Sequence, residues 1–207
     1  MKFVLFVEGY TENKALPLFL KKWLDPKLPQ PAGIKTVRFD GWRELVKDAP
    51  RKARMHLNGP GKDEIIAVIS LLDLYGPTFY PDRCKDRDER YAWGKKHMED
   101  EVNHPRFRQF FAVHEVEAWL LSYPNLFPPD VKKALPAKTK DPERVNFEEP
   151  PAKLLDRLYL KHTKRPYKKV TNGRELFGKL DPDIAYQKCP YFGELLDTML
   201  ELAQGPE

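Results

Sequence analysis

Short apolar runs recur through the first half of the chain. Residues 2–7 and 65–72 are almost entirely apolar, and runs of this length rich in β-branched and aromatic side chains predict strands buried on both faces. Residues 34–39 alternate, and residues 106–113 end in a second aromatic run, which predicts two more strands. Segments with helical spacing separate these strands. They are predicted at residues 12–24, 42–57, 86–103 and 118–122.

Strands that alternate with helices favour one architecture. We predict an α/β domain with a mainly parallel sheet flanked by helices over residues 1–123. Thr11 is predicted to cap the first helix, which buries Leu18 among other residues, and Pro50 to disturb the second. Prolines then punctuate residues 124–207, where a helical extension packed on the core is expected. Its predicted helices cover residues 152–160, 173–180 and 191–203.

Acidic residues follow three of the predicted strands. Glu8 follows the first strand, Asp73 ends the most apolar one, and Glu115 and Glu117 follow the last. Glu12 lies one helical turn after Glu8. Because the carboxyl ends of parallel strands share one edge of a sheet, we expect these carboxylates to converge there.

Gathered carboxylates need a compensating positive charge. Oxygen ligands without a His/Cys cluster favour Mg²⁺ or Mn²⁺ over Zn²⁺, so all five acids are candidate metal ligands. Taken singly, each has an ordinary alternative: Glu8 as a turn acid, Glu12 as a first-turn helix acid. Glu115 and Glu117 share a face only if the strand continues through them, and diverge if a helix has begun.

Positive charge is concentrated in one window. The chain has a formal net charge of +5, and residues 150–180 hold nine Lys or Arg against two acids. A loop within this window is predicted to contact nucleic-acid phosphates, with a tyrosine stacking on an exposed base. Two residues after the Asp73 strand are added to this surface. The alternative for the loop is a solvated segment, and the alternative for these two residues is pairing with Asp82, Asp86 and Asp88 on the surface. The proposed contacts are Lys161, Lys164, Arg165, Tyr167, Lys168, Lys169, Arg83 and Lys85.

Composition excludes several classes of protein. The chain has 207 residues, 41% of them hydrophobic and 32% charged, which is typical of a folded domain rather than a disordered one. No apolar run is long enough for a membrane span, and the N-terminal run is too short for a signal peptide. Cys84 and Cys189 form neither a zinc pair nor a disulfide framework, so we expect a cytoplasmic location.

Several motifs carry a resemblance to a known family. VEGYTE at residues 7–12 resembles the opening of TOPRIM domains, which occur in topoisomerases, primases and overcoming-lysogenization-defect (OLD) nucleases. LLDLYGP at residues 71–77, FYP at 79–81, VHEVEAWLL at 113–121 and CPYF at 189–192 resemble a narrower bacterial family. That TOPRIM-like family includes the nuclease effector of the PARIS anti-phage system.

The resemblance implies a metal-dependent nuclease that cuts RNA, including tRNA, or DNA in an anti-phage or stress response. It implies Glu8, Asp73 and Glu117 as catalytic residues, with Glu12 and Glu115 completing the metal ligands. An ATPase partner and a homodimer are also implied. TOPRIM domains usually carry Asp-x-Asp, whereas Tyr75 stands here in place of the second acid. The alternatives are one metal instead of two, or a non-catalytic subunit that binds nucleic acid or an ATPase. A phosphotransfer or signalling domain leaves the basic window unexplained.

Overall fold

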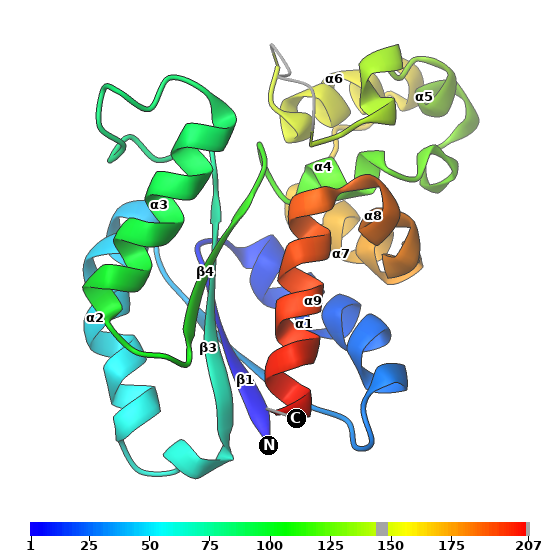
Figure 1. Cartoon of the computed structure of the whole chain (residues 1–207). Helices are drawn as coiled ribbons and strands as arrows, with labels where there is room; N and C mark the ends of the chain where they lie inside the picture. Colours follow the sequence, from blue (N-terminus) through cyan, green and yellow to red (C-terminus); the bar gives the residue numbers. More distant parts are fainter. Residues whose placement is uncertain (144–148, 206–207) are drawn as a thin grey trace.

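A four-stranded parallel sheet forms the centre of the molecule. The computed structural model describes residues 1–143 and 149–205. The strands are β1 (Lys2–Val7), β2 (Gly33–Arg38), β3 (Ile65–Asp73) and β4 (Phe107–Ala112), in the order β2-β1-β3-β4. Every pair is parallel, so all four carboxyl ends lie at the edge that points upward in Figure 1. The predicted α/β fold with a parallel sheet is confirmed.

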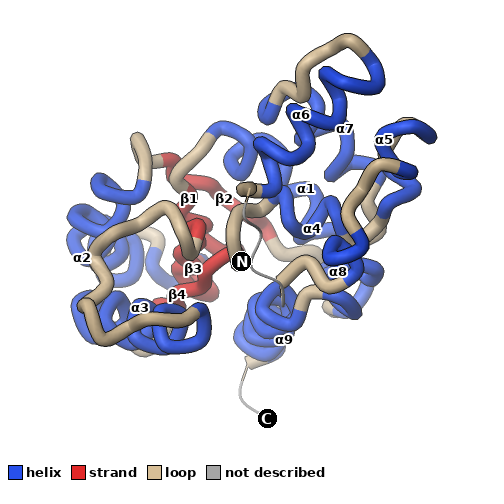
Figure 2. The backbone as a smooth tube through the Cα atoms, turned by 90° about the horizontal axis from the view of Figure 1, so that it is seen from above, coloured by secondary structure: helices blue, strands red, loops and turns tan. Residues whose placement is uncertain are grey.

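Helices cover both faces of the sheet. α2 (Trp42–Asn58) and α3 (Arg87–Val102) cover one face, while α1 (Tyr10–Leu24) and α9 (Pro190–Gln204) cover the other (Figures 1 and 2). The remaining helices gather beyond α1 and α9, near the carboxyl edge of the sheet. They are α4 (Glu117–Leu121), α5 (Pro129–Lys133), α6 (Pro151–Thr163), α7 (Lys169–Lys179) and α8 (Pro182–Lys188). Single 3-10 turns are η1 (Asp25–Lys27), η2 (Lys62–Glu64), η3 (Pro124–Leu126) and η4 (Ala137–Lys140).

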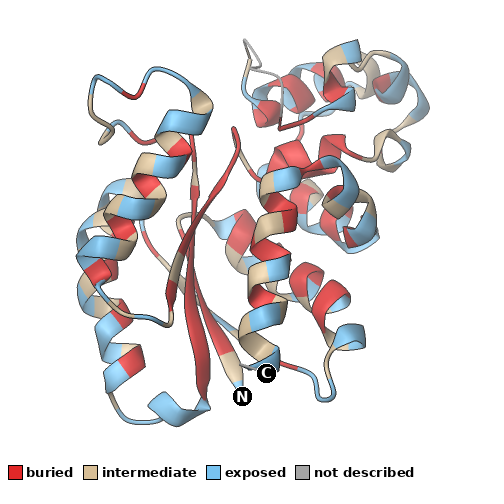
Figure 3. Cartoon of the chain, in the orientation of Figure 1, coloured by how far each residue is buried: buried red, intermediate tan, exposed pale blue. Residues whose placement is uncertain are grey.

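One hydrophobic cluster joins the two parts of the chain. Phe3 and Leu5 of β1 share it with Phe19 of α1 and with Phe177 and Phe192 of the C-terminal helices. The Phe19 ring lies 5.1 Å from Phe177 and 5.5 Å from Phe192, between centroids. Figure 3 shows the buried residues continuing from the sheet into these helices. The C-terminal helices are therefore fixed relative to the sheet, and so are the side chains that they carry toward its edge.

Three details of α1 and α2 differ from expectation. α1 begins at Tyr10 with Gly9 as N-cap, so Thr11 lies inside the first turn and does not cap it. Leu18 is exposed, at 70%, instead of inward. α2 runs unbroken through Pro50.

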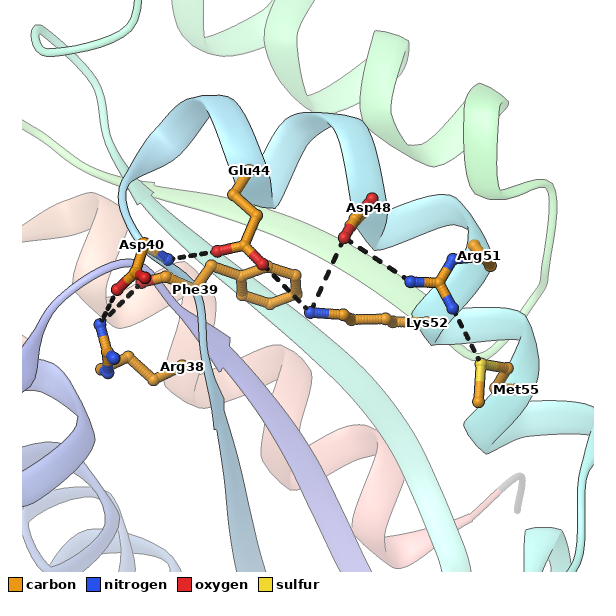
Figure 4. A network of polar contacts seen from close by, with 8 residues as sticks. All are labelled: Arg38, Phe39, Asp40, Glu44, Asp48, Arg51, Lys52 and Met55. Atoms are coloured by element: carbon orange, nitrogen blue, oxygen red, sulfur yellow. Dashed lines mark hydrogen bonds and ion pairs between the residues drawn. The ribbon is translucent and has the colours of Figure 1, made fainter.

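Polar contacts on the outer face of α2 span Pro50. Asp48 pairs with Arg51 at 3.6 Å and with Lys52 at 3.9 Å, and Lys52 also reaches Glu44 at 3.5 Å (Figure 4). Such partly exposed pairs each contribute only a few tenths of a kcal/mol. Together with the buried Ala49 and Ala53 packed on the sheet, they hold the helix on both sides of the proline.

Candidate functional site

The ends of β1 and β3 bring two of the predicted acids together. The backbone N–H of Asp73 donates a hydrogen bond to Oε1 of Glu8 at 2.9 Å. β1 and β3 are neighbours in the sheet. β2 lies on one side of β1, whereas β3 and β4 lie on the other, so the strand order reverses between β1 and β3. Ligands of open α/β sheets bind beside such a switch point. The expectation that residues 8 and 73 share one location at the sheet edge is met by the geometry.

Glu12 lies against the start of its own helix. Its carboxylate covers the Cα of Gly9, so that a Cβ at residue 9 would stand 2.3 Å from Oε2 of Glu12. A side chain at residue 9 would therefore displace the carboxylate. Glycine is needed at this position of the opening motif because it leaves space for Glu12, which is 7% exposed, to turn back toward Glu8.

The segment after β4 changes direction sharply. His114 has a φ of 71°, a left-handed conformation that is unusual for a residue with a side chain. Helix α4 then begins at Glu117, so the strand does not continue through Glu115 and Glu117. The two glutamates nevertheless meet again, because both pair with the same lysine.

Lys169 stands among the acids. Its Nζ lies 3.0 Å from Oε1 of Glu115 and 3.4 Å from Oε2 of Glu117. Lys169 is the first residue of α7, so the C-terminal helices supply this charge to the sheet edge. It was predicted to contact nucleic-acid phosphates; its ion pairs place it inside the carboxylate cluster instead. Its position 52 residues beyond Glu117 in sequence gave no signal for this role.

Burial and mutual repulsion shift the protonation of the cluster. Burial is the main cause that raises the pKa of Glu8 and, more strongly, that of Asp73; neighbouring carboxylates raise both further, whereas Lys169 lowers both. Burial likewise raises the pKa of Glu12. For Glu117, whose side chain is fully buried, burial raises the pKa to about 7. The charge of Lys169 is thus too small to neutralise all of these carboxylates.

The two glutamates after β4 differ in the hydrogen bonds that their carboxylate oxygens accept. Glu115 accepts a hydrogen bond from the N–H of Ala152 at 2.9 Å through Oε2, while Oε1 accepts from Lys169, so both oxygens are engaged. Glu117 is buried, and neither of its oxygens accepts a hydrogen bond within the described residues. A buried carboxylate without hydrogen bonds is costly unless something else satisfies it. Glu117 is therefore better placed than Glu115 to bind a cation.

The donor set fits a divalent metal ion. All candidate ligands are carboxylates, which suit a hard cation such as Mg²⁺ or Mn²⁺, and Glu117 has buried oxygens to offer. Across residues 1–143 and 149–205, no three acidic, His or Cys side chains are already arranged around a single point. Binding would thus require the carboxylates to rotate toward each other, with Lys169 shifting from between them.

The predicted nucleic-acid contacts fall into three groups. Lys161, Lys164, Arg165 and Lys168 are exposed at the end of α6 and in the turn before α7, and Arg83 and Lys85 are exposed on the loop after β3. Lys169 belongs to the carboxylate cluster. Tyr167 is a correction: it is 6% exposed, its ring lies 5.6 Å from that of Tyr159, and it has no free face for a base.

One buried acid outside the carboxylate cluster was not anticipated. Glu143 is 1% exposed and accepts hydrogen bonds from Nε1 of Trp119 at 3.1 Å and from the N–H of Tyr191 at 2.8 Å. Burial raises its pKa to about 7. Glu143 joins α4 to the start of α9, which gives the Trp119 and Tyr191 motifs a structural role.

Fold and site together define an α/β protein with acids at the carboxyl edge of a parallel sheet. The chain belongs to the family described as "Domain of unknown function (DUF4276)", whose model matches residues 7–200. No curated protein matches it.

Two solved structures are similar over nearly the whole chain. The C-terminal region of the Burkholderia pseudomallei OLD protein is 20% identical, with a TM-score of 0.50, over 97% of this chain and 98% of that one. The C-terminal region of the Xanthomonas campestris pv. campestris OLD protein is 17% identical, with a TM-score of 0.46, over 98% and 94%. The first likeness supports the fold. No helix among the described residues has the length and apolar character of a membrane span.

Proposed function

We propose that this protein is a metal-dependent phosphodiesterase that cleaves nucleic acid. One observation carries the proposal: Glu115 and Glu117 after β4 both pair with Lys169, whose charge also acts on Glu8 and Asp73 at the ends of β1 and β3, and the fully buried Glu117 has no hydrogen-bond partner in the described structure. Mg²⁺ or Mn²⁺ held there would supply an activated water and stabilise the leaving oxygen. The candidate ligands are Glu8, Glu12, Asp73 and Glu117, with Glu115 positioned by its bonds to Ala152 and Lys169.

The chain's own residues have separate tasks in this proposal. Glu8 is fixed by the Asp73 N–H, which leaves its second oxygen for a ligand or a proton. Burial raises the pKa of Glu8 above its ordinary value, which makes its carboxyl a better proton acceptor, as a general base requires. Lys169 limits the repulsion among the acids before metal and substrate bind. The exposed cations around Lys164 would attract the phosphate backbone.

The finer parts of the proposal rest on the motif resemblance. We extend it to RNA, including tRNA, or DNA as substrate, and to a cytoplasmic role in anti-phage or stress response. A regulatory ATPase and a second copy of this chain are the partners proposed on the same ground. The VHEVEAWLL motif at residues 113–121 supports this extension, because it contributes both Glu117 and the Trp119 that binds Glu143.

The test is cleavage by the purified chain of single-stranded RNA, tRNA and DNA, with Mg²⁺, Mn²⁺ or a chelator. We expect metal-dependent cleavage that falls by at least about 100-fold in Glu8→Gln and Asp73→Asn. Gln at residue 8 can still accept the Asp73 N–H, so this variant preserves the local structure. Glu64→Gln is the matched control, because Glu64 is exposed and pairs with Lys2 at the opposite end of the strands.

A non-catalytic nucleic-acid-binding subunit is the second candidate. The observation that favours it is Tyr75, which stands two residues after Asp73 where a second acid is usual. Binding of nucleic acid without cleavage under any metal condition, together with no calorimetric Mg²⁺ binding, would support this candidate and reject the enzyme. Cleavage unaffected by both site variants would also reject the proposed site.

A further inference from the structure

A cavity of about 290 Å³ lies among the residues that follow Asp73. It is formed by the loop that follows β3 and by the first turn of α3, and its lining includes Tyr75, Tyr80, Asp82, Lys85 and Arg90. Its volume is near the lower end of the range for small-molecule sites. Tyr80 lies close enough to the site for the charges of Glu8 and Asp73 to raise its pKa, although burial is the main cause.

An aromatic stack separates this cavity from the turn after β4. The Tyr75 ring lies on the imidazole of His114, with centroids 5.0 Å apart and planes at 13°. Tyr75 lines the cavity and His114 does not, so the tyrosine ring lies between the two. Tyr75 follows Asp73 by two residues, and His114 directly precedes Glu115. The stack is thus attached on both sides to acids of the candidate site.

Arg90 faces two aromatic rings in the cavity. Its guanidinium carbon is 5.6 Å from the centroid of Tyr75 and 5.7 Å from that of Tyr80. Nε donates to the carbonyl oxygen of Cys84 at 3.3 Å, which anchors one side of the guanidinium. The Tyr80 hydroxyl donates to the carbonyl oxygen of Leu74 at 3.0 Å and so fixes the second ring. Flat, oriented groups therefore surround the space next to Tyr75.

We propose that this cavity binds one unpaired base of a single-stranded nucleic acid whose neighbouring phosphate lies at the carboxylate cluster. This inference rests on the proposed function and specifies its substrate. Aromatic rings and Arg guanidinium planes are the groups on which unstacked bases settle, and a paired base has no free face to offer. Asp82 favours a base over a second phosphate, since its carboxylate repels phosphate but accepts from exocyclic amines.

The inference gives Tyr75 a positive role. A stacking ring occupies the place of a second acid, so the site exchanges one metal ligand for a contact to substrate. Lys85 at the cavity rim then lies on the path of the backbone next to the bound base. We expect the cavity to bind single-stranded RNA and DNA with similar affinity, because stacking and phosphate contacts do not involve the 2′-hydroxyl.

The experiment measures binding apart from cleavage. Fluorescence anisotropy with the full chain in chelator gives Kd for a labelled single-stranded RNA, the same DNA sequence, and each strand as a blunt duplex. We expect the single strands to bind more tightly than the duplexes. We expect Tyr75→Ala to raise the single-strand Kd by roughly 5- to 150-fold, the range for loss of one stacked base. Tyr75→Phe keeps the ring and stays within about twofold of the parent.

Two further variants protect the test. Arg90→Gln removes a partly exposed guanidinium without touching the His114 stack, and we expect it to weaken single-strand binding as well. Tyr186→Ala is the matched control, because Tyr186 also stacks, on Trp23 at 5.3 Å, but on α8 away from the cavity. Equal Kd values for the parent, Tyr75→Ala and Arg90→Gln would overturn the inference, as would equal weakening by Tyr75→Phe and Tyr75→Ala.

The outcomes separate the inference from the proposed function. Metal-dependent cleavage with no change of Kd in the cavity variants would retain the enzyme and reject the base site. Loss of single-strand binding in those variants, from a chain that cleaves nothing, would retain the base site and reject the enzyme.

Discussion

Lys169 is the residue on which the charge balance of the site depends. Its ammonium group lies between Glu115 and the fully buried Glu117, and it lowers the pKa of the surrounding acids. Removing one member of a buried ion pair leaves the other charge uncompensated, which is more destabilising than replacing both. Since the Lys169 side chain is 43% exposed, water screens part of this effect.

Lys169→Met is expected to destabilise the metal-free protein at pH 8 by about 1–3 kcal/mol, below the range for fully buried pairs. Added Mg²⁺ should restore part of the loss, because a bound cation replaces the missing charge. Lys168→Met is the matched control: Lys168 is the exposed neighbour, and its loss should change the free energy of unfolding by less than about 0.5 kcal/mol. Urea unfolding checks this. Equal midpoints for the two variants would contradict it.

The packing of α1 against α7 fixes where Lys169 lies. At Gly173 on α7 the two helices approach so closely that a Cβ would stand 2.9 Å from Cγ2 of Thr11 and 3.3 Å from the Tyr167 hydroxyl. Thr11 immediately precedes Glu12 in the motif that follows β1. This contact thus joins the helix that carries the lysine to the helix that carries an acid.

Gly173→Ala is expected to destabilise the protein by about 1–2 kcal/mol, as overpacking outweighs the gain in helix propensity. Gly178→Ala, on the same helix, is the control. A Cβ at residue 178 meets no atom within 4 Å, so alanine there should stabilise by up to about 1 kcal/mol. Chemical unfolding of both variants measures the difference. The packing argument fails if the two substitutions shift stability in the same direction.

The elements were predictable to different degrees for physical reasons. The strand over residues 2–7 was predicted with its observed bounds, because a run of apolar residues has few alternatives to a buried strand. The short α5 and α8 were missed, since helices of 5 and 7 residues are too short to show a helical periodicity. α2 passes through Pro50 because tertiary packing outweighs the local penalty.

The site was predictable only as far as strand ends determine it. The meeting of Glu8 and Asp73 follows from parallel strands alone. The position of Lys169 follows from how helices beyond residue 150 pack on α1, and the sequence pattern carries no information on that packing. The same holds for Tyr167, whose polar neighbours indicate exposure although its ring is buried against Tyr159.

At the scale of the whole molecule, buried acids should govern stability against pH. Burial raises the pKa of Glu117 and of Glu143 to about 7. It also raises the pKa of Glu8, Glu12 and Asp73. A carboxyl with a raised pKa stabilises the fold fully below its unfolded pKa, near 4.5, and this contribution is lost as pH rises through the folded pKa. For Glu117 or Glu143 the loss is on the order of 3 kcal/mol.

We therefore expect the metal-free protein to melt at lower temperature at pH 8 than at pH 5.5. Added Mg²⁺ should reduce the difference, because it favours the ionised form of the site acids. It should not remove it, since Glu143 bonds Trp119 and Tyr191 rather than the site. Thermal melts across this pH range, in chelator and in Mg²⁺, check the prediction. A melting temperature that rises with pH in chelator would contradict it.

The separation of Lys169 from its acidic partners has a consequence for synthesis. Because a ribosome synthesises the chain in the N- to C-terminal direction, Glu8, Asp73 and Glu117 all emerge before Lys169. Until α7 is made, the nascent chain has its negative groups but lacks the cation that steadies them. Translation must pass residue 169 before the ion pairs of Lys169 with Glu115 and Glu117 can form, and a product truncated earlier would lack them.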